Sequence, residues 1–403
     1  KIIKDVGVHI DASVKADTVI DGDKHVLAPG VIDMRVKTGE PGEEHKETLA
    51  TASRAAAAGG VTSCVVMPDT SPVIDNVALV DFINRRARDT AQTRIYPAGG
   101  LTIGLEGRRM SEIGLMQEAG AVLFTNGEQA VEDASTMRRA MQYAAGFDAL
   151  VMSRPDTHSL TRGAMMNAGA FAARLGLKGT PPQAEWIAVE RDLVLAEMTG
   201  ARLLVDQVST RRTLEAIEQA RGRGVEVYCT VSACNLFFNE LDIGDYLTYC
   251  KVFPPFRSED DRQAMADGLA RGAIDAVVSA HDPQPPEDKR LPLPEAAYGA
   301  AGLETLLSAV LHLVHEEQLS LPDALRPLTS RPAEILGLPQ GKLAKDAPAD
   351  IILVDIGAPW DCKREDLLSR SKNSPFDGRK LQGRVMQTYV DGNLVYDRNQ
   401  KAT

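Results

Sequence analysis

Two cations stand two residues apart in a stretch that otherwise suits a buried strand. Arg35 and Lys37 end the apolar run that follows the Pro29-Gly30 turn. Because the side chains of a strand alternate between its faces, both should leave the same face. Guanidinium and ammonium groups have no lone pair to offer a divalent metal. The pair therefore predicts either salt bridges, with Asp69, Glu128 or Asp282 as partners, or a site for a small anion.

Strands and helices alternate along most of the chain after residue 28. Apolar segments predict eight strands, at 30–37, 61–67, 93–98, 121–125, 148–153, 202–208, 226–231 and 274–280. Helices are predicted between them, most clearly at 46–58, 111–118, 135–145, 185–199, 213–222 and 259–271. Eight such units predict a (β/α)₈ barrel of the TIM type. An open doubly wound sheet is the competing fold, but no GxGxxG motif opens a helix after the first strand.

Both ends of the chain are typical of β structure instead. Residues 1–27 and the region from 340 onward alternate short polar and apolar runs, and Asp391-Gly392-Asn393 indicates a hairpin turn. We expect the two ends to combine into one small β-sandwich. The predicted domains are a composite β-sandwich, residues 1–28 and 340–403, and a barrel, residues 29–339.

Composition narrows the classes of function. The 403-residue chain carries a formal net charge of -11, which argues against binding to nucleic acid or to an anionic membrane. No apolar run approaches the length of a membrane span. The cysteines show neither a metal-binding nor a disulfide spacing, so we expect buried thiols in a cytoplasmic protein; they are Cys64, Cys229, Cys234, Cys250 and Cys362.

Several short motifs, in order along nearly the whole chain, resemble those of one family. They are Pro29-Gly30-Val31-Ile32-Asp33-Met34, Met67-Pro68-Asp69-Thr70-Ser71-Pro72-Val73, Phe253-Pro254-Pro255-Phe256-Arg257 and Ser374-Pro375-Phe376-Asp377-Gly378. Together they are similar to the dihydroorotases of the amidohydrolase superfamily. That resemblance implies a barrel with a small β-sandwich, and it locates the positions that hold metal ions in the family.

The residues at those positions are unsuited to metal. By the resemblance, the metal-ligand positions fall on Arg35, Lys37, Asn126, Ser153, Gln207 and Ala280, and the substrate-binding positions on Gly39, Asp69, Phe253 and Gln284. None of the six ligand positions offers an imidazole or a carboxylate. The sequence therefore predicts no zinc or other cofactor and no catalytic residue. It leaves at most a residual polar pocket, made of Arg35, Lys37, His281 and Asp282.

These observations predict a catalytically inactive, dihydroorotase-like protein that is not an enzyme. The resemblance implies a structural role in de novo pyrimidine biosynthesis, with the catalytic chain of aspartate carbamoyltransferase as partner and a homo-oligomer inside the larger complex. Two alternatives stay open. One is an active cyclic amidohydrolase with an atypical, metal-poor site around His281 and Asp282, and the other is a sensor of a small anion. Asp206 neighbours Gln207 on its predicted strand and is expected on the opposite face.

Overall fold

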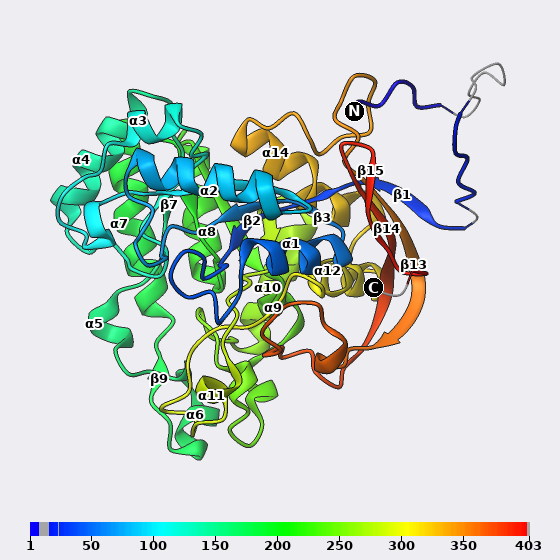
Figure 1. Cartoon of the computed structure of the whole chain (residues 1–403). Helices are drawn as coiled ribbons and strands as arrows, with labels where there is room; N and C mark the ends of the chain where they lie inside the picture. The colour runs from blue at the N-terminus through cyan, green and yellow to red at the C-terminus, as the bar shows by residue number, and fades with distance from the viewer. Residues whose placement is uncertain (8–15, 23, 401–403) are drawn as a thin grey trace.

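The computed structural model describes residues 1–7, 16–22 and 24–400 of the chain (Figure 1). Part of the predicted N-terminal β segment, residues 8–15 and 23, lies outside the described residues. In the described ranges, no helix combines the length and the apolar character that a membrane span requires.

A closed barrel of parallel strands forms the centre of the protein. In order around the ring, its strands are β2 (Val31–Val36), β3 (Val61–Val66), β4 (Arg94–Pro97), β6 (Phe124–Thr125), β7 (Val151–Ser153), β10 (Leu203–Val205), β11 (Val227–Ser232) and β12 (Ala276–Val278). The short strand β5 (Gly99–Gly100) follows β4 and pairs with β6. A parallel bridge between Val36 and His281 closes the ring. Each predicted strand is present, and the predicted barrel is confirmed.

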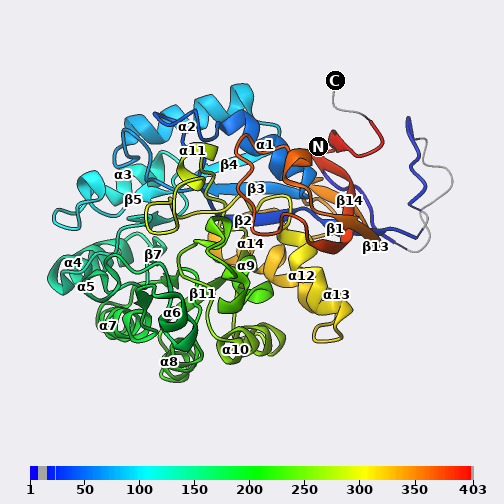
Figure 2. The same cartoon turned by 90° about the horizontal axis from the view of Figure 1, so that it is seen from below.

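Helices surround the barrel, as the view from below shows (Figure 2). The larger ones are α1 (Leu49–Ala58), α2 (Val77–Thr90), α3 (Ile113–Glu118), α4 (Ala134–Ala145), α7 (Gln183–Thr199), α8 (Arg211–Gly222), α10 (Glu259–Ala270), α12 (Leu306–His315) and α14 (Ser330–Leu336). Most were predicted, but α2 was not. Shorter turns of helix are η1 (Ile103–Leu105), α9 (Ala233–Phe237), η2 (Glu240–Ile243), η3 (Thr248–Cys250), α11 (Pro286–Lys289), α13 (Leu321–Leu325), η4 (Arg326–Leu328) and η5 (Arg364–Asp366).

An unpredicted excursion separates β7 from α7. It consists of α5 (His158–Thr161), β8 (Met166–Asn167), α6 (Ala170–Leu175) and β9 (Gly179–Thr180), and β8 and β9 pair in parallel outside the barrel. Arg257 fastens this excursion to the barrel, because its guanidinium donates to Asn167 Oδ1 at 3.0 Å and to the Thr180 carbonyl at 3.2 Å.

A second sheet combines both ends of the chain. Its antiparallel order is β1 (Val26–Pro29), β13 (Ile351–Asp361), β14 (Lys380–Val390) and β15 (Asn393–Asp397), and it lies beside α1 and α12 (Figure 1). The predicted hairpin turn is confirmed, since Val390 pairs with Asn393. The expected strands before residue 26 are mostly absent from the described residues, where Ile2 makes a single bridge to Pro348. The exact domain boundaries stay a prediction.

A bulge in β2 turns its polar end toward the mouth of the barrel. Asp33 pairs with Cys64 and Val36 with Val66, so β2 holds one residue more than β3 over this interval. The extra residue breaks the alternation of side chains and re-aims those next to it. Met34 packs in the barrel's inner apolar cluster, while Arg35, the next residue, reaches the polar groups above that cluster.

Candidate functional site

A network of buried and half-buried charges lies where several barrel strands end. We call it the charge network, and its members are Arg35, Lys37, Asp69, Glu128, Arg154, Asp206 and Asp282. They follow or end β2, β3, β6, β7, β10 and β12. This is the carboxyl end of the strands, the face that carries the active site in barrels of this kind.

Arg35 is the centre of the charge network. Its Nε donates to Asp206 Oδ2 at 2.7 Å, and a terminal nitrogen pairs with Glu128. The Arg35 side chain is only 2% exposed. Glu128 also forms an ion pair with Arg154, whose terminal nitrogen lies 2.7 Å from Glu128 Oε2. Two arginines therefore hold one carboxylate between them.

Lys37 joins the remaining carboxylates. Its Nζ lies 3.0 Å from Asp69 Oδ2, 3.5 Å from Asp282 Oδ2 and 3.9 Å from Glu128 Oε1. The predicted pairing of the two cations with Asp69, Glu128 and Asp282 is confirmed.

The charges of the network compensate one another. Burial opposes the charge on Glu128, but Arg154, Arg35 and Lys37 outweigh it and hold the pKa of that carboxyl well below its usual range. Burial raises the pKa of Asp282, with Lys37 acting against it. An added anion would have to displace these carboxylates, so the structure does not favour the predicted anion site at Arg35 and Lys37.

The expectation for Asp206 is wrong. Strand β10 ends at Val205, and Gln207 has a φ of 53°, so the alternation of faces stops before Asp206. The Asp206 carboxylate turns toward Arg35 and also accepts from the hydroxyl of Thr230 at 3.2 Å and the amide of Gln207 at 3.3 Å.

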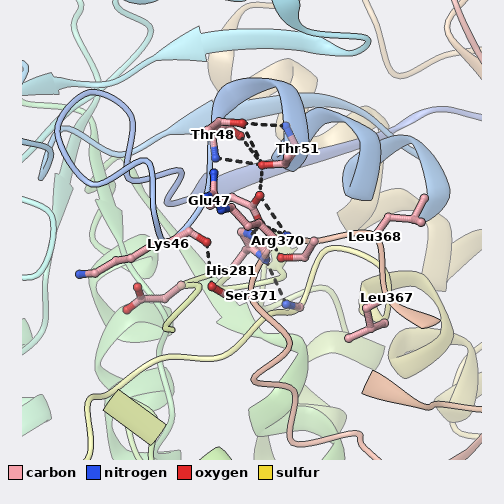
Figure 3. Close-up of polar contacts among 12 residues, drawn as sticks. Lys46, Glu47, Thr48, Thr51, His281, Leu367, Leu368, Arg370 and Ser371 are labelled. Carbon is pink, nitrogen blue, oxygen red and sulfur yellow. Dashed lines mark hydrogen bonds and ion pairs between the residues drawn. The ribbon is translucent and has the colours of Figure 1, made fainter. Parts of the chain in front are cut away.

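His281 belongs to a different polar cluster. Its Nδ1 accepts the backbone N–H of Gly302 at 3.2 Å, which leaves the proton on Nε2, and Nε2 lies 3.6 Å from Glu47 Oε2. Glu47 also accepts from the hydroxyl of Ser369 and, at 3.0 Å, from the backbone of Arg370 (Figure 3). Of the predicted residual pocket, the structure brings together Arg35, Lys37 and Asp282, while both ring nitrogens of His281 face other groups.

Three of the predicted substrate positions belong to the charge network or contact it. Gln284 donates from Nε2 to Asp282 Oδ1 at 2.8 Å, and Asp69 pairs with Lys37. Phe253 lies beneath Arg154, whose guanidinium carbon is 4.5 Å from the ring centroid.

The other predicted positions lie outside the charge network. Asn126 accepts from the backbone of Thr102 at 3.0 Å and donates to the Leu105 carbonyl at 3.2 Å, so it holds a loop. Gly39 turns the chain with a φ of 70°. Ser153 is buried at the end of β7, and Ala280 adopts a φ of 52°.

Sequence reasoning missed Arg154 in the charge network and Glu47 in the separate cluster around His281. Arg154 directly follows the strand predicted at 148–153, and a charge placed there in a barrel points to its mouth. The sequence therefore held a signal that placed Arg154 at the site. Glu47 offered no comparable signal, because its partners Ser369 and Arg370 are more than 300 residues away.

A small cavity opens beside the charge network. Its volume is about 20 Å³, and Arg35, Glu128, Gln207, Asp282 and Tyr298 are among the residues that line it. Room of that size holds roughly one water molecule.

The donor set here does not fit a divalent metal. Arg35 and Lys37 occupy two of the ligand positions, and each is paired with the carboxylates that would otherwise be free to coordinate. In the part of the chain that the structure describes, no three histidine, cysteine, aspartate or glutamate side chains are grouped to hold a metal ion. We therefore derive no chemical step through a metal.

A parallel barrel with a polar site at its carboxyl end, joined to a sheet built from both chain ends, agrees with the amidohydrolase class. The family model for Dihydro-orotase-like proteins matches residues 24–213, and that for the Amidohydrolase family matches residues 210–395. With these matches and the relatives below, the chain belongs to the dihydroorotase-like family of the amidohydrolase superfamily.

Similar proteins agree with this assignment. The chain is 41% identical to a dihydroorotase of Desulforapulum autotrophicum, over 93% of this chain and 87% of the relative. It is 39% identical to a dihydroorotase of Anaplasma phagocytophilum, over 96% and 86%. Among solved structures, an L-hydantoinase (dihydropyrimidinase) from Arthrobacter aurescens matches with a TM-score of 0.90 and 26% identity, over 100% of this chain and 92% of that one.

Three expectations from the sequence are contradicted by these relatives. An inactive protein and the absence of enzyme activity conflict with relatives that are named dihydroorotase and span nearly the whole chain. The absence of a cofactor conflicts with a family whose members typically depend on zinc. The prediction of an inactive protein was wrong because it rested on six metal-ligand positions alone. The sequence identity to dihydroorotases extends over nearly the whole chain.

Proposed function

We propose that this protein is a cyclic amidohydrolase of the dihydroorotase type, which opens a ring by hydrolysing an amide bond within it. One observation carries the proposal: a relative named dihydroorotase is 41% identical over 93% of this chain. The L-hydantoinase with a TM-score of 0.90 supports the same class of reaction, by its name.

The charge network contains groups suited to parts of this chemistry. Asp282 lies at the cavity, and burial raises its pKa, which brings a carboxylate closer to the range useful for a general base. Lys37 and Arg35 hold carboxylates of the network in place, Lys37 beside Asp282 and Arg35 beside Asp206. Asp282 would take a proton from the attacking water, and Gln284 and Lys37 orient its two oxygens.

Ring opening of dihydroorotate by the purified chain tests the proposal. We expect turnover in the wild type and a fall of about 10²-fold or more in Asp282→Asn. Glu190→Gln is the matched control, because Glu190 is a surface carboxylate and should leave the rate unchanged. Thermal unfolding of each variant separates loss of chemistry from loss of fold. A wild type no faster than the uncatalysed reaction, with and without added zinc, would overturn the proposal.

We also propose, on the family resemblance alone, a partnership with the catalytic chain of aspartate carbamoyltransferase and a homo-oligomeric, cytoplasmic protein. The partnership is tested by light scattering on the chain alone and mixed with that transferase. A shared peak of higher mass supports it, and two unchanged peaks contradict it.

A further inference from the structure

A large cavity lies between the barrel and the sheet of the two chain ends. It has a volume of about 810 Å³. Its walls come from α1, α12, strands β13 to β15 and the segment 363–368, and α1, α12 and β14 lie side by side in Figure 1. None of its lining residues belongs to the charge network. The cavity is therefore separate from the proposed active site.

Three arginines line this cavity without a carboxylate partner. Arg54 comes from α1, Arg384 from β14, and Arg398 follows β15. Among the described residues, none of the three has a carboxylate within 4.0 Å. Arg54 is exposed, whereas Arg384 and Arg398 are half-buried. Most other buried or half-buried arginines of this protein, such as Arg35 and Arg94, are paired with acids. Unpaired guanidinium groups around one cavity are groups that an anion would satisfy.

Arg384 and Arg398 have further features that point to a missing partner. The Nε–H of Arg384 is buried and finds no acceptor in the described part of the chain. Burial lowers the pKa of Arg398, and the charge of Arg384 lowers it further. Two like charges near each other in a partly buried place repel, and an anion would relieve that repulsion.

The acids around the cavity compensate these cations only in part. Glu304 accepts the backbone N–H groups of Leu368 and Ser369, and burial raises its pKa to about 7, so it is only partly charged at neutral pH. Asp397 accepts from Gln387 and from its own turn. The other two acids, Asp361 and Asp366, are exposed to solvent.

Aromatic rings lie beside two of the three arginines. The guanidinium carbon of Arg384 lies 5.1 Å from the ring centroid of Trp360, and that of Arg398 lies 5.6 Å from the ring centroid of Tyr396. Stacking on a ring fixes the plane of a guanidinium, so its donors are oriented before an anion arrives. The rings also offer apolar surface to an organic ligand.

We propose that this cavity is a binding site for a phosphate-bearing metabolite of about nucleotide size, with its phosphate paired to Arg54, Arg384 and Arg398. The cavity volume lies in the range of small-molecule sites. Guanidinium groups match the oxygen geometry of phosphate, and the aromatic and aliphatic walls accommodate the organic part.

Calorimetric titration of the full chain tests the site. The probes are inorganic pyrophosphate, AMP and UMP, with adenosine and uridine as uncharged counterparts. We expect binding of at least one phosphate probe at millimolar concentration or below, no binding of the nucleosides, and weaker binding in higher salt. If only pyrophosphate binds, the site recognises the phosphate group alone. If a nucleotide binds more tightly than pyrophosphate, the site also recognises the base.

Variants connect the binding to the arginines. Arg54→Gln changes an exposed side chain that has no polar partner among residues 1–7, 16–22 and 24–400, so the variant should fold normally and bind the phosphate probe about tenfold more weakly. Arg384→Gln should do the same. Arg138→Gln, on α4, is the matched control and should bind as the wild type does. No binding of any phosphate probe, or equal binding by all three variants and the wild type, would overturn the proposal. Hydrolysis of a cyclic amide does not enter these measurements, so the two proposals succeed or fail separately.

Discussion

Replacing Arg35 by methionine removes the centre of the charge network while keeping a long, apolar side chain in its place. Asp206, whose side chain is 3% exposed, would lose the one cation that pairs with it in the described part of the chain and keep two neutral donors, from Thr230 and Gln207. Glu128 would keep Arg154 at 2.7 Å. The loss therefore falls mainly on Asp206.

We expect Arg35→Met to lower the free energy of unfolding by about 3–5 kcal/mol, the usual cost of leaving one buried charge without its partner. Urea unfolding at pH 7 measures this as a shift of the midpoint at constant slope. The double variant Arg35→Met/Asp206→Leu removes both charges, and it should recover much of the loss because a buried ion pair and an apolar pair are often similar in stability.

A surface pair provides the control. Arg212 and Glu190 lie 3.1 Å apart with side chains 49% and 52% exposed, so Arg212→Met should cost less than about 1 kcal/mol. The reasoning is refuted if Arg35→Met costs no more than Arg212→Met. It is also refuted if the double variant loses the sum of its two single changes, since partners in contact should be coupled.

Further predictions concern pH, backbone space and thiols. Although burial opposes its charge, Glu128 has a pKa held below its ordinary 4.5 by Arg154 and its neighbours, so its stabilisation is present above that pH and lost below it. The stability gap between wild type and Glu128→Gln should shrink by up to about 1.4 kcal/mol per pH unit below 4.5 in urea titrations, and a constant gap would contradict this. Gly127 has a φ of 60° and a Cβ there would lie 2.7 Å from Asp69 Cγ, whereas Gly176 has a φ of 68° and open space. Gly127→Ala should therefore cost about 1–3 kcal/mol more than Gly176→Ala in the same assay. A thiol reagent should modify the cysteines only after unfolding, because all are buried and burial raises the thiol pKa to about 12 at Cys229, Cys234, Cys250 and Cys362.

The barrel strands were predictable because each is a compact apolar run between turns. The excursion at 158–180 was not, since its strands are two residues long and have no period to detect. The same limit affects the site. That Arg35 and Lys37 pair with Asp69, Glu128 and Asp282 follows from charge and barrel topology. Asp206 joins them because β10 ends just before it, and no residue of the sequence marks that end.

Function was harder to predict than structure. The chemistry of the side chains at positions 35 and 37 shows that these two cannot bind a metal ion. The conclusion that the whole protein is inactive went beyond that observation. Asp282 reached the charge network although β12 ends at Val278, because the segment after the strand continues beside Val36 and Ala300. Local sequence propensity does not predict this continuation, because pairing with residues far away in the chain creates it.

The Glu47 cluster has a consequence for how the chain is made. Glu47 accepts from Ser369 and Arg370, which follow it by 322 and 323 residues, and β1 finds its partner in β13. During synthesis, the first strands and α1 therefore emerge from the ribosome long before the groups that complete them. Contacts of such sequence separation slow folding, and until they form, a carboxylate destined for the interior has no donors. A chain that stops before Ser369 should be damaged at its beginning as well as at its end.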